Sequence, residues 1–204
     1  MQAQLVASTL DEETARAEVY GLLAALVYAA PSAALYDKLR VAVTQAPAAG
    51  ALLERSWSEL VGSAREHSLA DISREYDALF GGVGKPEVYL FGSHYLSGFL
   101  NEKPLAALRN DIAALGLARD EAMPETEDHV AYLFEVMRYL IAGDNVEVAN
   151  LTRQREFFTR HVQPWVSVMC KAVTQHPKAR FYFQLAAFTQ SFIDIESQGF
   201  DMLD

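Results

Sequence analysis

The sequence predicts an all-α protein, a single-domain bundle of about eight to ten helices. About half of its 204 residues (51%) are hydrophobic, with many alanines and leucines, which favour packed helices. Apolar residues recur at intervals of three and four along most of the chain, the spacing of one helix face. No repeat, low-complexity tract or Gly/Ser linker divides it, so residues 1–204 are predicted to form one domain.

The first helices are predicted from capping signals and apolar stripes. Thr9-Leu-Asp-Glu12 has the pattern of a capping box, and the apolar stripe behind it extends to Val27. Pro31 cannot continue that helix and is expected to start the next, about residues 32–44. The uncharged run around Pro31 is long enough for a membrane span, but the proline interrupts it, so two helices and no membrane insertion are expected. A third helix is expected at about 49–67 and a fourth from about Asp71 through Phe80.

A glycine-rich stretch, Gly81-Gly-Val-Gly-Lys-Pro86, then breaks the helical pattern. The aromatic segment Val88–Tyr95 follows it. A short strand there would have no second strand to pair with, so an ordered loop is predicted.

Helical spacing returns in the second half of the chain. One helix is expected at about 103–115, ending at Gly116, and the next is expected to open at Pro124 with the acidic group 125–128. A further helix runs through Phe157 and Val162 until Pro164 breaks or kinks it. The last is expected at about 178–195.

Charge and cysteine content limit the partners and the compartment. With 17 basic and 27 acidic residues the net charge is −10, which repels nucleic acids and anionic lipids and favours a cationic partner such as an arginine-bearing peptide. Cys170 is the single cysteine, so an intrachain disulfide is excluded. The N-terminus lacks the basic and apolar regions of a signal peptide, and a cytoplasmic location is expected.

The spacing of reactive residues argues against an enzyme. None of the five histidines has another three or four residues away, and no Cys-x-x-Cys or Glu-x-x-His motif occurs, so no metal site and no bound cofactor are expected. Gly81–Lys85 has some likeness to a phosphate-binding loop, but Leu79 and Pro86 stand where the Walker pattern needs glycine and Ser or Thr. Cys170 lies on an apolar helix face, where thiols are commonly buried and inert.

Three blocks together resemble the TorD/DmsD/NarJ family of molybdoenzyme maturation chaperones. Glu75-Tyr-Asp-Ala-Leu-Phe-Gly-Gly, followed by Gly92-Ser-His-Tyr95, is similar to the family's acid-aromatic-x-x-Leu-Phe-x-Gly-Pro segment and aromatic loop. Glu125-Thr-Glu-Asp-His129 is similar to its Glu-Pro-x-Asp-His. Phe157 to Trp165 is similar to its His-Leu-x-Pro-Trp block. Two departures, Val83 and Thr126, stand where the family often has proline.

The resemblance implies a TorD-like helical bundle and a binding role. Family members bind the twin-arginine signal peptide or N-terminal segment of a client, the catalytic subunit that receives a molybdopterin cofactor. Here it implies a cytoplasmic chaperone that keeps such a precursor competent for cofactor insertion and delays its export. Family members occur as monomers and as helix-swapped dimers. The alternative is a protein that handles a nucleotide or the molybdopterin cofactor through Gly81–Lys85, without binding a signal peptide.

A receptor for two arginines and an apolar stretch needs carboxylates beside an aromatic-lined groove. Asp128, Tyr132, Glu135 and Tyr139 are spaced to share one helical stripe. With the positions that match the family's groove, the predicted client-binding residues are Tyr76, Leu79, Phe80, Phe91, Gly92, Ser93, Tyr95, Glu125, Asp128, His129 and Tyr132.

Structural alternatives stay open for these residues. The acidic group could cap a helix, and one carboxylate could do both. His129 is at the edge of an apolar stripe and could be a buried structural histidine. Aromatic residues at helical spacing usually pack in a core, whereas the glycine-flanked Phe91 and Tyr95 are more consistent with partial exposure.

Overall fold

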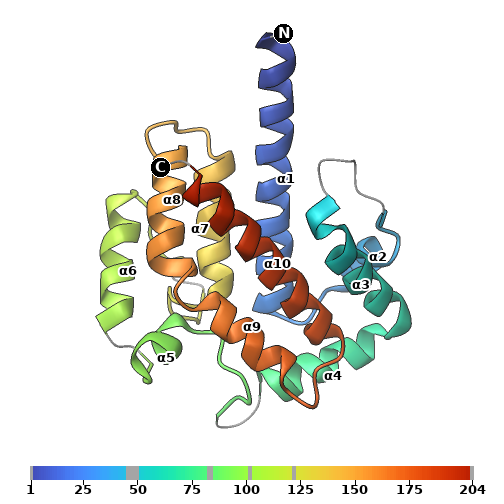
Figure 1. Ribbon diagram of the computed structural model, residues 1–204. Helices are drawn as coiled ribbons and strands as arrows, with labels where there is room; N and C mark the ends of the chain where they lie inside the picture. The colour runs from blue at the N-terminus through green and yellow to red at the C-terminus, as the bar shows by residue number, and fades with distance from the viewer. Residues whose placement is uncertain (1, 45–50, 82–84, 101–102, 121–122, 203–204) are drawn as a thin grey trace. The chain divides into compact units, whose positions relative to one another are not determined.

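A computed structural model describes residues 2–44, 51–81, 85–100, 103–120 and 123–202. Within these ranges the chain forms ten α-helices, a π-helical turn and no strand, which confirms the all-α prediction (Figure 1). The chain divides into two compact units, Met1–Tyr28 with Phe91–Trp165, and Ala29–Leu90 with Val166–Asp204. That the whole chain forms one domain stays a prediction.

The first unit is built around two helices that pack along each other, α1 (Gln2–Tyr28) and α7 (Val130–Ala142). Between them the rings of Tyr20 and Phe134 lie 5.7 Å apart, and both are fully buried. The other elements of this unit are α5 (Gly92–Ser97), α6 (Lys103–Ala114), α8 (Leu151–Phe157) and the π-helix η2 (Phe158–Val162). Helix α5 contacts α6, while α8 and η2 contact α7.

The second unit is organised around α10 (Phe181–Asp201). This helix packs against α3 (Ala51–Glu66), α4 (Leu69–Leu79) and α9 (Val166–Thr174), and α2 (Ala33–Arg40) packs on α3. Its inner face carries Leu185, Phe188 and Phe192, each no more than 2% exposed. An apolar face repeated every three or four residues is what the spacing predicted.

Helix starts follow local capping chemistry. Helix α1 begins at Gln2 and runs through Thr9, so the predicted capping box at Thr9–Glu12 is not a helix start. Ser32 caps α2 by accepting the Leu35 N–H, which agrees with a start just after Pro31. Helix α4 has a capping box of its own, in which Ser68 and Asp71 each accept the other's backbone N–H.

The acidic group 125–128 is not in the first turn of a helix. Helix α7 starts at Val130, and its N-cap is His129, whose Nδ1 accepts the Ala131 N–H at 3.2 Å. Asp128 therefore precedes the helix and does not share a helical stripe with Tyr132, Glu135 and Tyr139, which was expected from their spacing. The histidine supplies the cap because its side-chain nitrogen reaches the orphan N–H of the first turn.

The segment predicted as an ordered loop contains structure that the sequence pattern did not reveal. Phe91 forms an isolated antiparallel bridge with His129, and the Gly92 N–H donates to the Asp128 carbonyl at 2.9 Å. Immediately after the bridge the chain turns into α5, which ends at Gly98 in the left-handed conformation (φ 79°). The missing second strand is thus replaced by residues 128–129.

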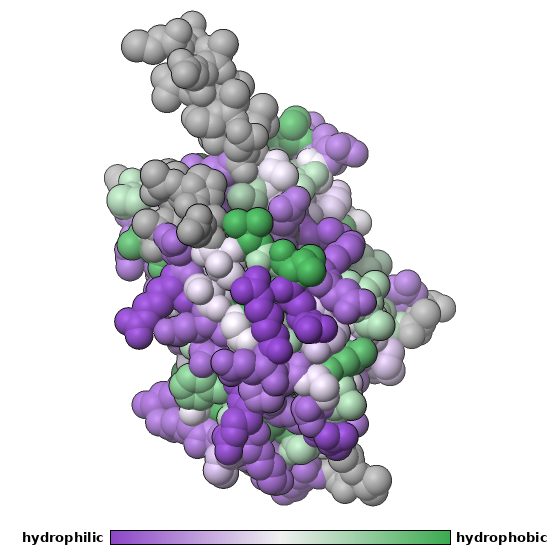
Figure 2. Space-filling view, turned by 90° about the vertical axis from the view of Figure 1, so that its right-hand side faces the viewer, coloured by the Kyte–Doolittle hydropathy of each residue, from purple (hydrophilic) through white to green (hydrophobic). Residues whose placement is uncertain are grey.

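A helix that crosses a membrane needs about 20 consecutive, predominantly apolar residues. Among the described residues no helix combines the length and the apolar character needed to cross a bilayer. The face in Figure 2 is largely hydrophilic, and hydrophobic residues form small separate patches on it.

Candidate functional site

Asp128 is the centre of a buried polar cluster in the first unit. Its side chain is 3% exposed, and its carboxylate accepts three hydrogen bonds. Oδ2 accepts the Ser93 N–H at 2.9 Å and also the Ser93 hydroxyl, and Oδ1 accepts the Thr126 hydroxyl at 2.6 Å. A buried carboxylate needs such donors to offset its lost hydration. Asp128 therefore fastens the start of α5 to the segment that precedes α7.

His129 lies beside this cluster and is 4% exposed. Its ring makes edge contacts with the rings of Phe91 (5.0 Å) and Tyr28 (6.1 Å). Burial lowers the pKa of His129 to about 4, and the neighbouring Asp128 only partly opposes this effect. The ring is neutral at pH 7, and because Nδ1 accepts the Ala131 N–H, the hydrogen is on Nε2. His129 thus acts as a helix cap within an aromatic environment.

An aromatic wall continues from α5 to Trp165. The Tyr95 and Trp165 rings stack with centroids 5.5 Å apart and an interplanar angle of 16°. Gly92 allows this approach, because a Cβ at that position would lie 3.0 Å from Trp165 Nε1 and 3.1 Å from Cε2. Trp165 is almost completely buried, whereas Phe91 and Tyr95 are half-buried. Phe91 and Tyr95 are thus the two aromatic residues of this wall that keep accessible surface.

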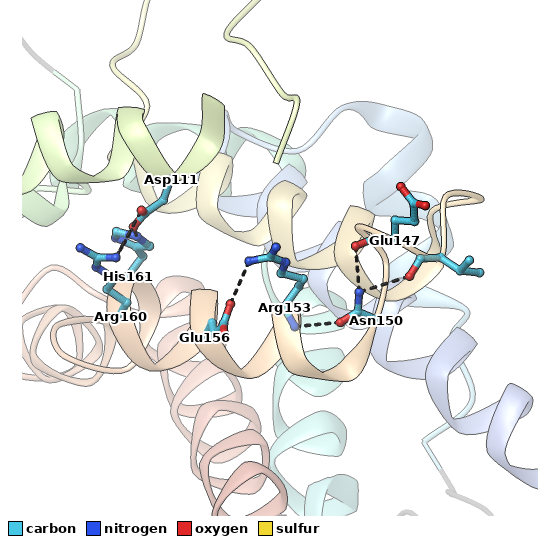
Figure 3. A network of polar contacts seen from close by, with 8 residues as sticks. Asp111, Glu147, Asn150, Arg153, Glu156, Arg160 and His161 are labelled. Atoms are coloured by element: carbon cyan, nitrogen blue, oxygen red, sulfur yellow. Dashed lines mark hydrogen bonds and ion pairs between the residues drawn. The ribbon is translucent and has the colours of Figure 1, made fainter. Parts of the chain in front are cut away.

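Trp165 is also fixed by polar contacts that involve residues of the π-helix η2. Trp165 Nε1 donates to the His161 carbonyl at 2.7 Å. The distance between His161 Nε2 and Asp111 Oδ2 on α6 is 2.7 Å (Figure 3). Arg160 also forms an ion pair with Asp111. Burial lowers the pKa of His161, although its hydrogen bond to Asp111 opposes the shift. Pro164 lacks an N–H and follows the π-turn, in which the Gln163 N–H reaches the Phe158 carbonyl.

The other predicted residues of this unit lie at its surface. Tyr132 is half-buried, and its hydroxyl accepts the Asp120 N–H at 3.1 Å. Glu125 is half-buried, and its carbonyl accepts from Arg119. Glu127 makes an ion pair with Arg109 at 2.9 Å. The structure therefore brings together Phe91, Gly92, Ser93, Asp128 and His129, and it leaves Glu125 and Tyr132 outside that cluster.

Three predicted residues, Tyr76, Leu79 and Phe80, belong to the second unit. Leu79 is fully buried in its core. Tyr76 and Phe80 are half-buried, and their rings contact each other (5.3 Å) and the ring of Tyr182 (5.7 and 5.1 Å).

Next to them, Glu75 accepts the backbone N–H groups of Arg180, Phe181 and Tyr182 at 2.7, 3.0 and 2.8 Å. The acid of the acid-aromatic motif thus caps the N-terminus of α10, where a negative charge is favoured.

Metal binding needs a group of ligands close together, and thiol chemistry needs an ionised cysteine. Among the described residues no three His, Cys, Asp or Glu side chains are grouped so that they could hold a metal ion. Cys170 is buried, and burial raises the pKa of its thiol to about 12, so it is protonated at neutral pH. Residues 82–84 of the Gly81–Lys85 loop lie outside the described residues, so the phosphate-loop alternative is not tested here.

Sequence reasoning missed three contributors. Trp165 is not among the predicted site residues, yet it stacks on Tyr95 and faces Gly92. Thr126 was noted only as a departure from proline, yet its hydroxyl binds Asp128. The function of Glu75 as a cap was not foreseen. A Thr-x-Asp pattern next to a helix start is the one local signal that could have indicated the second of these.

Comparison with known proteins identifies the family. A family model described as "Nitrate reductase delta subunit" matches residues 45–171, more than half of the chain. The chain belongs to the nitrate reductase delta subunit family. The match covers all three blocks that carry the resemblance, and it confirms the resemblance to the TorD/DmsD/NarJ chaperones.

Relatives of this family member carry the name Chaperone protein TorD. The one from Vibrio cholerae serotype O1 is 23% identical over 146 residues, which are 68% of this chain and 66% of the relative. The one from Vibrio parahaemolyticus is 23% identical over 142 residues, 65% of this chain and 66% of the relative. The match thus spans just under two thirds of these two relatives. The one from Shewanella loihica is 25% identical over 208 residues, 91% of this chain and 92% of the relative.

Proposed function

We propose that this chain is a maturation chaperone for a molybdenum-containing oxidoreductase and not an enzyme. It binds the N-terminal, twin-arginine segment of the catalytic subunit in the cytoplasm, keeps the apo-subunit competent for cofactor insertion and delays export. The observation that carries the proposal is membership of the nitrate reductase delta subunit family together with relatives named Chaperone protein TorD. The net charge of −10 supports a cationic client segment.

The half-buried aromatic side chains are suited to the apolar part of such a segment. Phe91 and Tyr95 in the first unit, and Tyr76 and Phe80 in the second, keep accessible ring surface in otherwise well-packed regions. Aromatic anchors of this kind dominate peptide recognition because they bury a large area with few rotatable bonds.

Asp128 has a different role in this proposal from that of an arginine partner. Its carboxylate is buried and already accepts three hydrogen bonds, so a guanidinium could reach it only by displacing Ser93 or Thr126. We assign it as a positioning residue that holds Phe91 and α5 in place. Replacement of Asp128 then weakens client binding indirectly, through the loss of order in this segment.

The test is a calorimetric titration of the purified chain with a synthetic peptide that carries two adjacent arginines followed by an apolar stretch. We expect saturable binding that weakens with added salt, because exposed ion pairs are screened. A peptide with both arginines replaced by citrulline, which keeps their shape and removes their charge, should bind more weakly. Equal affinity for the two peptides would contradict recognition of the arginines.

The aromatic part of the proposal has its own variant. Phe91→Ser removes a half-buried ring without changing the charge. It should reduce the affinity for the arginine peptide and for the citrulline peptide by the same factor. Pull-down of the client precursor from cells that produce the chain would identify the client subunit. Size-exclusion chromatography of the same sample would distinguish a monomer from a helix-swapped dimer.

A further inference from the structure

Three carboxylates around the predicted site, those of Asp128, Glu127 and Glu135, already have partners. Asp128 accepts three hydrogen bonds, and Glu135 pairs with Arg138 at 2.9 Å. Glu127 pairs with Arg109. If the proposed function holds, the two arginines of the client need carboxylates that are accessible and adjacent to apolar surface. The surface between α3 and α10 in the second unit offers such a place.

A depression of about 430 Å³ lies between these two helices, which run side by side in Figure 1. Helix α3 and the residue that follows it contribute one wall, and the start of α10 contributes the other. Its lining residues are Glu59, Gly62, Ser63, Glu66, His67, Ala179, Arg180, Phe183 and Gln184. The small side chains at positions 62 and 63 leave room over the helix backbone.

Two glutamates border this depression on the α3 side. Glu59 and Glu66 are seven residues apart, two turns of one helix face, so they are separated by about 10 Å along the axis. Within the described part of the chain Glu59 has one ion pair, with the exposed Arg55, and an exposed pair of this kind contributes little to stability. Among the described residues Glu66 makes no ion pair. Both carboxylates are thus accessible to a guanidinium.

One arginine, Arg180, lines the depression, and its side chain is bonded to the local backbone. Arg180 Nη1 donates to the carbonyls of Pro177 (3.0 Å) and Ala179 (2.8 Å), so its guanidinium is held against the local backbone. Two carboxylates therefore face one engaged arginine, and the charge of the depression is complementary to a cationic peptide and not to an anion.

The remaining lining adds an apolar contact and an acceptor. Phe183 is 39% exposed, so its ring can contact an apolar part of a bound peptide. His67 Nδ1 lies 2.9 Å from the Ser63 carbonyl, which can only accept, so Nδ1 carries the hydrogen of the neutral ring. Nε2 is then an acceptor, and no hydrogen bond within the described part of the chain occupies it.

We propose that the α3–α10 depression, with Glu59 and Glu66 at its edge and Phe183 in it, binds the adjacent arginines of a client's leader segment. This proposal rests on the proposed function and names the part of the surface that would bind the positive charges of the leader segment. Each guanidinium is received by one glutamate, with charge-assisted hydrogen bonds, and Phe183 contacts the aliphatic part of an arginine or the apolar residue beside it.

The test is a double-mutant design with the arginine peptide and the citrulline peptide. The variant Glu59→Gln/Glu66→Gln keeps the shape of the depression and removes two negative charges. We expect it to bind the arginine peptide about fivefold more weakly, the size expected for two partly exposed ion pairs, and to bind the citrulline peptide as wild type does. Phe183→Ser should weaken binding of both peptides.

The matched control is Glu12→Gln/Glu18→Gln, which removes the same two negative charges at two exposed positions of α1. It should bind both peptides as wild type does, with far-UV circular dichroism unchanged for all variants. If Glu59→Gln/Glu66→Gln still prefers arginine over citrulline as strongly as wild type, this site is overturned while the proposed function stands.

If wild type does not distinguish the two peptides at all, the arginine-reading role fails together with this site. A changed elution volume in size-exclusion chromatography, with unchanged peptide affinity, would assign the depression to a second copy of the chain.

Discussion

Asp128 in the first unit and Glu75 in the second both accept hydrogen bonds at the start of a helix, but their donors differ. Each carboxylate accepts three hydrogen bonds and fastens the start of one helix to a distant segment. Asp128 accepts one backbone N–H and two hydroxyls, from Ser93 and Thr126, and it is 3% exposed. Glu75 accepts three consecutive backbone N–H groups, at 180–182, and it is half-buried.

The difference predicts how each site tolerates an amide. A hydroxyl can donate or accept, so an asparagine at 128 could donate its amide hydrogen to the Thr126 hydroxyl and still accept from Ser93. A backbone N–H can only donate, so a glutamine at 75 would set an NH₂ against one of the three N–H groups. Truncation of the buried aspartate to alanine should therefore cost more unfolding free energy than truncation of the capping glutamate. Replacement by the amide should remove a larger fraction of the glutamate's stabilising contribution than of the aspartate's.

The largest effect is expected for Asp128→Ala. The substitution leaves the N–H and hydroxyl of the fully buried Ser93 with no acceptor and removes the acceptor of the half-buried Thr126 hydroxyl, which together costs about 4 kcal/mol of unfolding free energy. Urea denaturation measures this loss. Asp128→Asn is the matched control and should lose only about 1 kcal/mol.

Amide hydrogen exchange localises the effect of Asp128→Ala. Exchange should accelerate at Ser93 and remain unchanged at Phe181, whose N–H is held by Glu75. Equal losses for Ala and Asn would show that charge, and not the number of acceptors, determines the contribution of Asp128.

The second effect is a dependence of stability on pH that originates at His129, next to Asp128. Burial lowers the pKa of His129 to about 4, below its ordinary value of 6.5. Between these two pH values the unfolded chain binds the proton and the folded chain does not. The free energy of unfolding therefore falls as the pH drops from 6.5 to 4, by about 3 kcal/mol, and is recovered above 6.5.

Urea unfolding at a series of pH values measures this dependence. His161, whose pKa burial also lowers, acts in the same direction, so its contribution must be separated. His129→Asn retains a capping side chain at the start of α7 but removes the titrating ring. It should flatten most of the dependence. A slope identical to that of wild type would show that His129 is not its source.

The fold was largely predictable because its signals are local. Pro31, Gly116 and the apolar stripe of α10 mark the elements they were expected to mark, since helix termination and amphipathic spacing depend on neighbouring residues. The exceptions were set by tertiary contacts. The 88–95 segment became a bridge and a short helix because its pairing partner is His129, a residue 38 positions from Phe91 in the sequence. No local pattern contains that information.

The candidate site was predictable in its membership and not in its roles. The resemblance nominated Asp128, His129, Phe91 and Ser93, and the structure brings these four together. It could not tell whether Asp128 faces a ligand or a serine, because a carboxylate followed by a histidine is compatible with both. The stacking of Tyr95 on Trp165 was equally inaccessible, since it depends on the π-turn and on the small size of Gly92.

The smallest effect is expected for Glu75→Gln, and it bears most directly on the comparison of the two carboxylates. The amide oxygen can replace Oε1, which accepts from Arg180 and Tyr182, but the NH₂ group then meets the Phe181 N–H. Losing one hydrogen bond and the charge at the N-terminus of α10 should cost about 1 kcal/mol in urea denaturation. Asp77→Asn, an exposed neighbour on the same helix, should cost nothing measurable.

Faster exchange at the Phe181 amide in Glu75→Gln, with no change at Ser93, would show that each carboxylate holds its own helix start. Faster exchange at both amides would show that the two helix starts are energetically coupled.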